Sequence, residues 1–71
     1  MYMLTAEQIR ELREKLGLTP TGFGAMLGVS DNTVRRWELG DRNPKHDTMV
    51  RLNELAKEHG IDLGKGLATA S

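Results

Sequence analysis

The chain has 71 residues, among them no cysteine, ten Lys or Arg and ten Asp or Glu, so its formal net charge is zero. This length allows one small domain, and the lack of cysteine excludes disulfide bonds and thiolate metal sites. A nucleic-acid-binding domain is usually basic, so here any attraction for phosphate has to come from where the charges lie.

Several classes of protein are disfavoured by what the sequence lacks. It has no signal peptide and no apolar run of about 18 residues, so we expect a cytoplasmic protein without a membrane span. No pattern resembles a nucleophile with its base, a phosphate-binding glycine loop or a catalytic carboxylate pair, so we expect neither an enzyme nor a cofactor. The two histidines, His46 and His59, have no Cys or carboxylate cluster beside them, so we expect no metal site.

The first predicted helix covers Ala6–Leu16. Thr5 followed by Gln8 is a capping-box pattern at its start, and Gly17 is placed to end it. Apolar residues recur at helical spacing and define its predicted buried side, which consists of Ile9, Leu12 and Leu16.

A second helix is predicted from Pro20 to Leu27. Thr19 and Pro20 supply an N-cap threonine and a proline at the first helical position. Glycine weakens a helix interior, so Gly24 suggests the close approach of another helix, whereas Gly22 has no such explanation. The residues expected to face inward are Phe23, Met26 and Leu27.

A third helix follows almost at once, over Asp31–Glu38. Gly28 favours the left-handed conformation that ends the preceding helix, and Ser30 is placed to cap the new one. Three residues separate the two helices, which is the spacing of a helix-turn-helix. Gly40 marks the end of this third helix.

The loop Gly40–Pro44 leads into a fourth predicted helix, His46–Glu58, which Gly60 ends. Its buried side is predicted to contain Met49, Leu52, Leu55 and Ala56. Over the four helices, the predicted core consists of Ile9, Leu12, Leu16, Phe23, Leu27, Val34, Trp37, Met49 and Leu52.

The third helix has two sides of different chemistry. Val34 and Trp37 fall on one side, with Thr33 at the margin, and the opposite arc carries Asp31, Asn32, Arg35 and Arg36. In the DNA major groove, asparagine pairs with adenine, arginine pairs with guanine, and aspartate accepts from cytosine. A polar arc is equally what any solvated surface helix presents, so the helix by itself leaves both interpretations open.

The surrounding motifs favour the interpretation that this helix reads DNA bases. The chain combines Leu-Gly-Val-Ser at 27–30, Val-x-x-Trp-Glu-x-Gly at 34–40 and Arg-x-Pro at 42–44. As a set they resemble the Cro-like (XRE) phage-repressor helix-turn-helix family, over about residues 5–56. The resemblance implies a lambda-repressor-like, all-α fold of four helices, or of five if Ile61–Ser71 forms another, for which its composition is poor.

The same resemblance implies a function and a set of roles. It implies sequence-specific binding of double-stranded DNA by a transcriptional regulator, most often a repressor, with helix 31–38 in the major groove. Asp31, Asn32 and Arg36 are then implied to read bases. Residues implied to contact or flank the DNA backbone are Thr19, Thr21, Ser30, Thr33, Arg35, Arg42, Lys45 and His46.

Comparison with the family pattern singles out one matching pair of residues and one departure. Arg13 and Glu38 match a partly buried salt bridge that ties the first helix to the third, which we interpret as structural. Pro20 stands where the family usually has glutamine, so an amide contact to phosphate is lost there, and Thr21 is the candidate substitute.

A single module of this kind buries only on the order of 600–1,000 Å² against DNA, so we predict a homodimer on a pseudo-palindromic site. We place its contact on the fourth helix and Ile61–Leu63, helped by Met1–Leu4. The predicted helix-turn-helix domain covers residues 1–60. Residues 61–71 form a predicted C-terminal tail, first a dimer contact and then a mobile end.

Two other functions stay open. Short chains that begin with Leu-Thr-x-Glu-Gln-Ile-Arg, as at 4–10, also resemble antitoxins that autoregulate their operon, and such a protein has a toxin as its partner. A protein-interaction module that does not bind DNA is favoured by the zero net charge and by Pro20.

Overall fold

The computed structural model describes residues 4–61, which form four helices: α1 (Ala6–Lys15), α2 (Pro20–Leu27), α3 (Asp31–Leu39) and α4 (His46–Glu58). Helix α1 ends one residue earlier than predicted, and α3 ends one residue later. No strand occurs within residues 4–61, so the predicted all-α, four-helix fold is confirmed. No helix in this range has the length and apolar character needed to cross a membrane.

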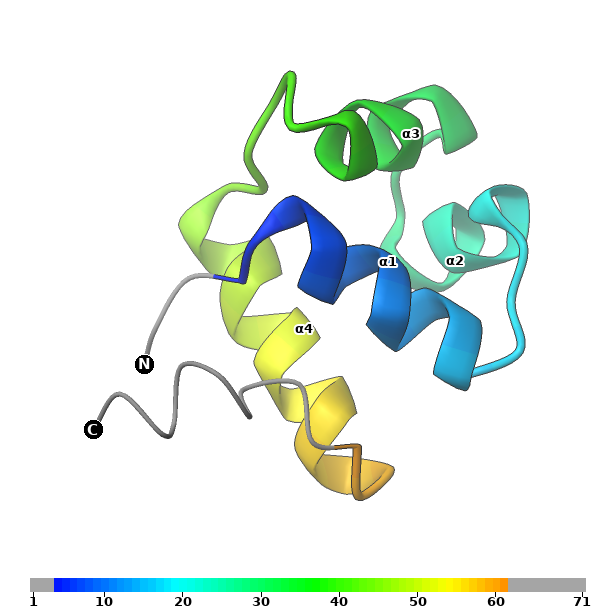
Figure 1. The fold of residues 1–71 in the computed structure, drawn as a ribbon, viewed down its shortest axis with the longest axis vertical. Helices are drawn as coiled ribbons and strands as arrows, with labels where there is room; N and C mark the ends of the chain where they lie inside the picture. The colour runs from blue at the N-terminus through cyan, green and yellow to red at the C-terminus, as the bar shows by residue number, and fades with distance from the viewer. Residues whose placement is uncertain (1–3, 62–71) are drawn as a thin grey trace.

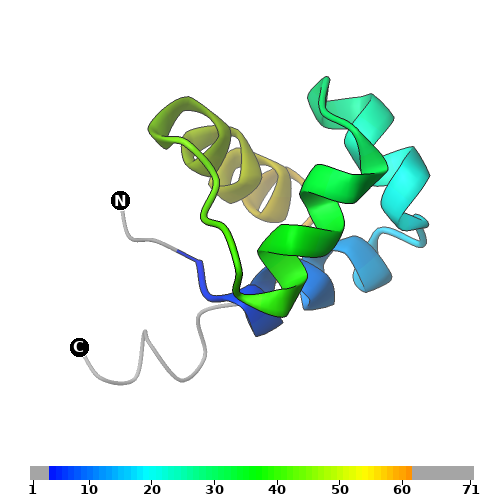
Figure 2. The ribbon, with the colours of Figure 1, turned by 90° about the horizontal axis from the view of Figure 1, so that it is seen from above.

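Helix α3 lies at one end of the molecule. In Figure 1 it is at the top, above α1, with α2 to the right and α4 below. Figure 2, seen from above, shows α3 in front of α1, with α2 on one side and the loop to α4 on the other. Helix α3 packs against α1 and α2, so its outer surface is left uncovered by the other described helices.

The helices begin where their capping residues predict. The Thr5 hydroxyl accepts from the backbone N–H of Gln8 at 3.1 Å, and the Gln8 side chain accepts from the Thr5 N–H at 2.9 Å, which completes the capping box. Thr19 caps α2 and Ser30 caps α3 in the same manner, through one backbone N–H each. Helix α4 starts after Lys45 without a side-chain cap.

Most of the predicted core is buried, and Leu16 and Leu27 are half-buried at its edge. The buried apolar residues are Leu4, Ile9, Leu12, Phe23, Val34, Trp37, Met49, Leu52, Leu55 and Ala56. The prediction for Met26 was wrong, because its side chain is 43% exposed. The buried side of α2 runs through Phe23 and Gly24, which turns Met26 to the rim.

Leu4 also departs from its prediction as a dimer contact. It is 5% exposed, and its backbone N–H lies 3.3 Å from the Met49 sulfur, so it belongs to the core of this chain. Residues 1–3 and 62–71, which include the other predicted N-terminal contacts, Leu63 and almost all of the predicted tail, lie outside the described residues. Ile61 packs half-buried against the core.

Gly24 is the point where α2 meets the turn that leads to α3. A Cβ atom there would lie 2.6 Å from the Val29 carbonyl oxygen and 3.2 Å from the Ser30 carbonyl. The close neighbour is therefore the backbone of the turn, not another helix as the sequence suggested. The Val29 N–H donates to the Gly24 carbonyl at 2.8 Å, so the approach is part of the closure of α2.

This contact predicts opposite effects for two glycines in one helix. Gly24→Ala should destabilise the fold by about 1–3 kcal/mol, since neither backbone segment can move without disturbing the turn. Gly22→Ala should stabilise it by about 0.5–1 kcal/mol, because its nearest neighbour, the Thr19 hydroxyl, would lie at an ordinary 3.4 Å. Urea unfolding of both variants measures the difference, and changes of the same sign would contradict the explanation.

Candidate nucleic-acid interface

The two sides of α3 separate as predicted. Val34 and Trp37 are buried in the core, whereas Asn32, Arg35 and Arg36 are exposed. Asp31 and Thr33 are half-buried at the margins between these sides. The predicted base-reading residues therefore share the surface that the other described helices leave uncovered.

Each arginine on this surface faces a carboxylate. Arg35 Nε lies 3.5 Å from Asp31 Oδ2, one helical turn earlier, and Arg36 Nη1 lies 3.4 Å from Asp41 Oδ2 in the following loop. All four side chains are substantially exposed, so each pair contributes little to stability. The sequence did not single out Asp41 for any role.

Ser30 has a structural task at the start of α3. Its hydroxyl accepts from the Thr33 backbone N–H at 3.1 Å and lies 2.9 Å from the Thr33 hydroxyl, with which it shares a hydrogen bond. This arrangement fixes both hydroxyl groups at the first turn of the helix, where the backbone N–H groups and the helix dipole favour negative charge.

The predicted pair Arg13 and Glu38 is present and binds α3 from its inner side. Arg13 Nε and Nη2 donate to the two Glu38 oxygens at 2.7 and 3.1 Å, and Nη1 donates to the Leu18 carbonyl at 2.9 Å. The two side chains are 14% and 11% exposed. The hydrogen bond to Glu38 raises the pKa of Arg13, which keeps the guanidinium charged.

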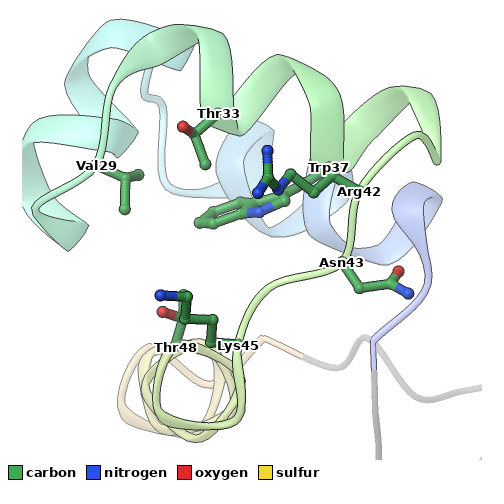
Figure 3. Close-up of a pocket in the computed structure, with 7 residues that line it drawn as sticks. All are labelled: Val29, Thr33, Trp37, Arg42, Asn43, Lys45 and Thr48. Atoms are coloured by element: carbon green, nitrogen blue, oxygen red, sulfur yellow. The ribbon is translucent and has the colours of Figure 1, made fainter.

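A hollow of about 320 Å³ lies between α3 and the start of α4, beside the loop. Figure 3 shows Thr33 reaching it from α3, and Lys45 and Thr48 from the beginning of α4. Its lining residues are Val29, Thr33, Trp37, Arg42, Asn43, Lys45 and Thr48. Two cationic side chains, Arg42 and Lys45, thus border a hollow whose floor is partly apolar, which is chemistry suited to an anionic oxygen.

A second hollow, of about 330 Å³, lies on the other flank of α3. It lies between the start of α2 and the C-terminal half of α3. Its lining residues are Arg10, Pro20, Arg35, Glu38 and Leu39. Arg35 and Pro20, at the helix start that lacks the usual glutamine, therefore border the same hollow. Leu39, at the rim, is 80% exposed.

The other predicted residues are distributed unevenly around these two hollows. Thr19 and Thr21 are exposed at the start of α2, and the Thr19 hydroxyl already accepts the capping hydrogen bond from Gly22. His46 is exposed but does not line the first hollow. Thr48 was missed, although it is the third residue of α4 and lies at the same helix start as the predicted Lys45.

Comparison with known proteins identifies one family. The helix-turn-helix family profile HTH_3 matches residues 9–63. A proposed HTH-type transcriptional regulatory protein of Pyrococcus furiosus is 42% identical over 55 residues, which cover 78% of this chain and 18% of that protein. Repressor protein C2 of Salmonella phage P22 is 31% identical over 51 residues, covering 72% of this chain and 24% of the repressor.

The relatives are much longer than this chain. The type II methyltransferase M.SsoII of Shigella sonnei is 45% identical over 42 residues, which are 55% of this chain and 11% of the enzyme. The chain thus spans less than a quarter of the length of each of these three relatives. No solved structure gives a significant match.

The buried ion pair yields a stability prediction. Glu38→Ala should destabilise the domain by about 3 kcal/mol, because it leaves the Arg13 charge largely buried without its partner. The matched control is Glu14→Ala, which removes an exposed partner of Arg10 at 3.8 Å and should cost less than about 1 kcal/mol. Urea unfolding compares the two variants. Equal decreases in the free energy of unfolding would show that the buried pair contributes no more to stability than the exposed one.

Proposed function

Because this chain belongs to the HTH_3 family of helix-turn-helix DNA-binding domains, with XRE/Cro-like character, we propose that it is a sequence-specific transcriptional regulator that acts as a repressor. The observation that carries the proposal is the outer surface of α3, where Asn32 and Arg36 are exposed on a helix anchored by Val34 and Trp37. Asn32 is assigned to adenine and Arg36 to guanine in the major groove, with Asp31 available to cytosine.

The loop after α3 supports a contact to the DNA backbone. We assign one phosphate to the first hollow, where Arg42 and Lys45 supply charge and Thr33 lines the wall. Within residues 4–61 neither Arg42 nor Lys45 forms an ion pair, so both charges are available to a phosphate. His46, exposed beside Lys45, is a flanking contact in this proposal.

A second backbone contact is assigned to the other flank of α3. Pro20 has neither a backbone N–H nor a side-chain donor, so the start of α2 offers little to a phosphate by itself. Arg35, whose exposed pair with Asp31 is weak, lines the same hollow as Pro20 and is the cation assigned to this contact. The exposed hydroxyls of Thr19 and Thr21 complete the set.

The names of the relatives agree with regulation, since they include a transcriptional regulatory protein and a repressor. We further propose that the domain acts by binding alone, without catalysis or a cofactor. Among residues 4–61, no group of three or more His, Cys, Asp or Glu side chains is arranged to hold a metal ion.

The test of base recognition by α3 begins with DNA duplexes selected from a random pool at a fixed salt concentration. Arg36→Ala should cost about 1–3 kcal/mol on the selected site and relax preference at one base pair, whereas Arg42→Ala should weaken all duplexes alike and lower the salt slope by about 1. Asn32→Ala should relax a neighbouring base pair.

Lys57→Ala is the matched control, because it removes one charge near the end of α4 that lies far from α3 (Figure 1). Affinities left unchanged by both Arg36→Ala and Asn32→Ala would refute the reading assignment and favour a protein-interaction module. Fluorescence anisotropy on selected and random duplexes gives all of these values.

We also propose that the functional unit is a homodimer, since one small interface on a neutral chain supplies limited affinity. Selected sites should then contain two inverted half-sites whose centres are about 34–36 Å apart. Sedimentation of the complex should give two protomers per duplex. One protomer on a site without symmetry would contradict the dimer.

A further inference from the structure

Helix α3 ends with a charged contact where the other described helices end with an apolar one. In all four, the residue after the terminal glycine donates its backbone N–H to the carbonyl five residues earlier, the pattern of a Schellman motif. The residues in that position are Leu18, Val29, Asp41 and Ile61. The three apolar ones pack against the core, whereas Asp41 is exposed.

The backbone of this motif fixes Asp41 beside Arg36. The Asp41 N–H donates to the Arg36 carbonyl at 3.0 Å, and the Arg42 N–H approaches the same oxygen at 3.3 Å. In a Schellman motif these two positions normally carry apolar side chains in contact with each other. Here the contact is between Asp41 Oδ2 and Arg36 Nη1, at 3.4 Å.

We propose that Asp41 is a positioning residue that raises the sequence discrimination of Arg36 by competing with DNA phosphate for its guanidinium. This inference rests on the proposed function. The two side chains are 48% and 61% exposed, so the pair is easily broken. A guanine is neutral and accepts two N–H groups of the Arg36 guanidinium in bidentate geometry, so the Asp41 carboxylate beside Nη1 does not repel it. A phosphate also pairs with arginine in bidentate geometry, but it is an anion, which the Asp41 carboxylate repels. Asp41 therefore disfavours contact with the DNA backbone more than contact with guanine.

Asp41 is the partner that can be changed without altering the helix surface. Arg35 has its own carboxylate partner, Asp31, but that residue lies within α3 and is itself a candidate base reader. Asp41 lies in the loop after Gly40, and its backbone hydrogen bond survives substitution of the side chain. Asp41→Asn therefore removes the charge alone.

The experiment measures affinity for a random duplex and for the selected duplex by fluorescence anisotropy at several salt concentrations. Asp41→Asn should bind the random duplex about two- to fivefold more tightly, the range expected for releasing an exposed ion pair, and the selected duplex about equally well. The ratio of selected to random affinity should fall accordingly. Asp41→Glu, which keeps the carboxylate, should preserve most of the ratio.

Two controls separate positioning from a general effect of charge. Glu58→Gln makes the same change in net charge at the far end of α4 and should leave the ratio unchanged (Figure 1). In an Arg36→Ala background, Asp41→Asn should also leave the ratio unchanged, because there is no guanidinium to hold.

An undiminished effect of Asp41→Asn in the Arg36→Ala background, or a ratio like that of wild type in the single variant, would overturn the inference while leaving the proposed function intact. Wild-type protein that binds no duplex at all would overturn the proposed function, and this inference with it. Urea unfolding of Asp41→Asn, expected to match wild type within about 0.5 kcal/mol, excludes a change in folding as the cause.

Discussion

The orientation of α3 depends on the Arg13–Glu38 pair. One guanidinium binds Glu38 on α3 and the Leu18 carbonyl in the turn before α2, so three segments meet at a single side chain of α1. Glu38 follows Trp37 directly, and the pair thus holds the same helix that the buried indole anchors. This pair and the two buried side chains of the nine-residue helix, Val34 and Trp37, together fix its rotation, and that rotation decides which side chains face outward.

Local chemistry made the helices predictable. The capping residues Thr5, Thr19 and Ser30 and the glycine that ends each helix act within five residues of where they stand, so a sequence displays them directly. The Arg13–Glu38 contact joins residues 25 positions apart, and no periodicity predicts it. It was expected only through the resemblance to a family, which covers the motifs on both sides of it.

The errors have physical causes of the same kind. Periodicity placed Met26 inward because it lies three residues after Phe23, but the closeness of Gly24 to the Val29 carbonyl turned α2 away from it. Leu4 precedes the first helix and so had no periodic neighbours, although it packs against Met49. Asp41 was within reach of sequence reasoning, because a Schellman motif always brings the residue after its glycine over the one five positions earlier.

The zero net charge of the chain is unevenly distributed over its surface. Five basic side chains face carboxylates, namely Arg10, Arg13, Lys15, Arg35 and Arg36. The positive charges of α1 and α3 are therefore nearly neutralised by their neighbours. Arg42 and Lys45 form no ion pair within the described residues, and both line one hollow. Under the proposed function, attraction for phosphate is concentrated beside α3 while the reading surface itself is held neutral. Non-specific binding grows with the number of phosphates that cations neutralise, so such a distribution gives up general affinity in favour of discrimination.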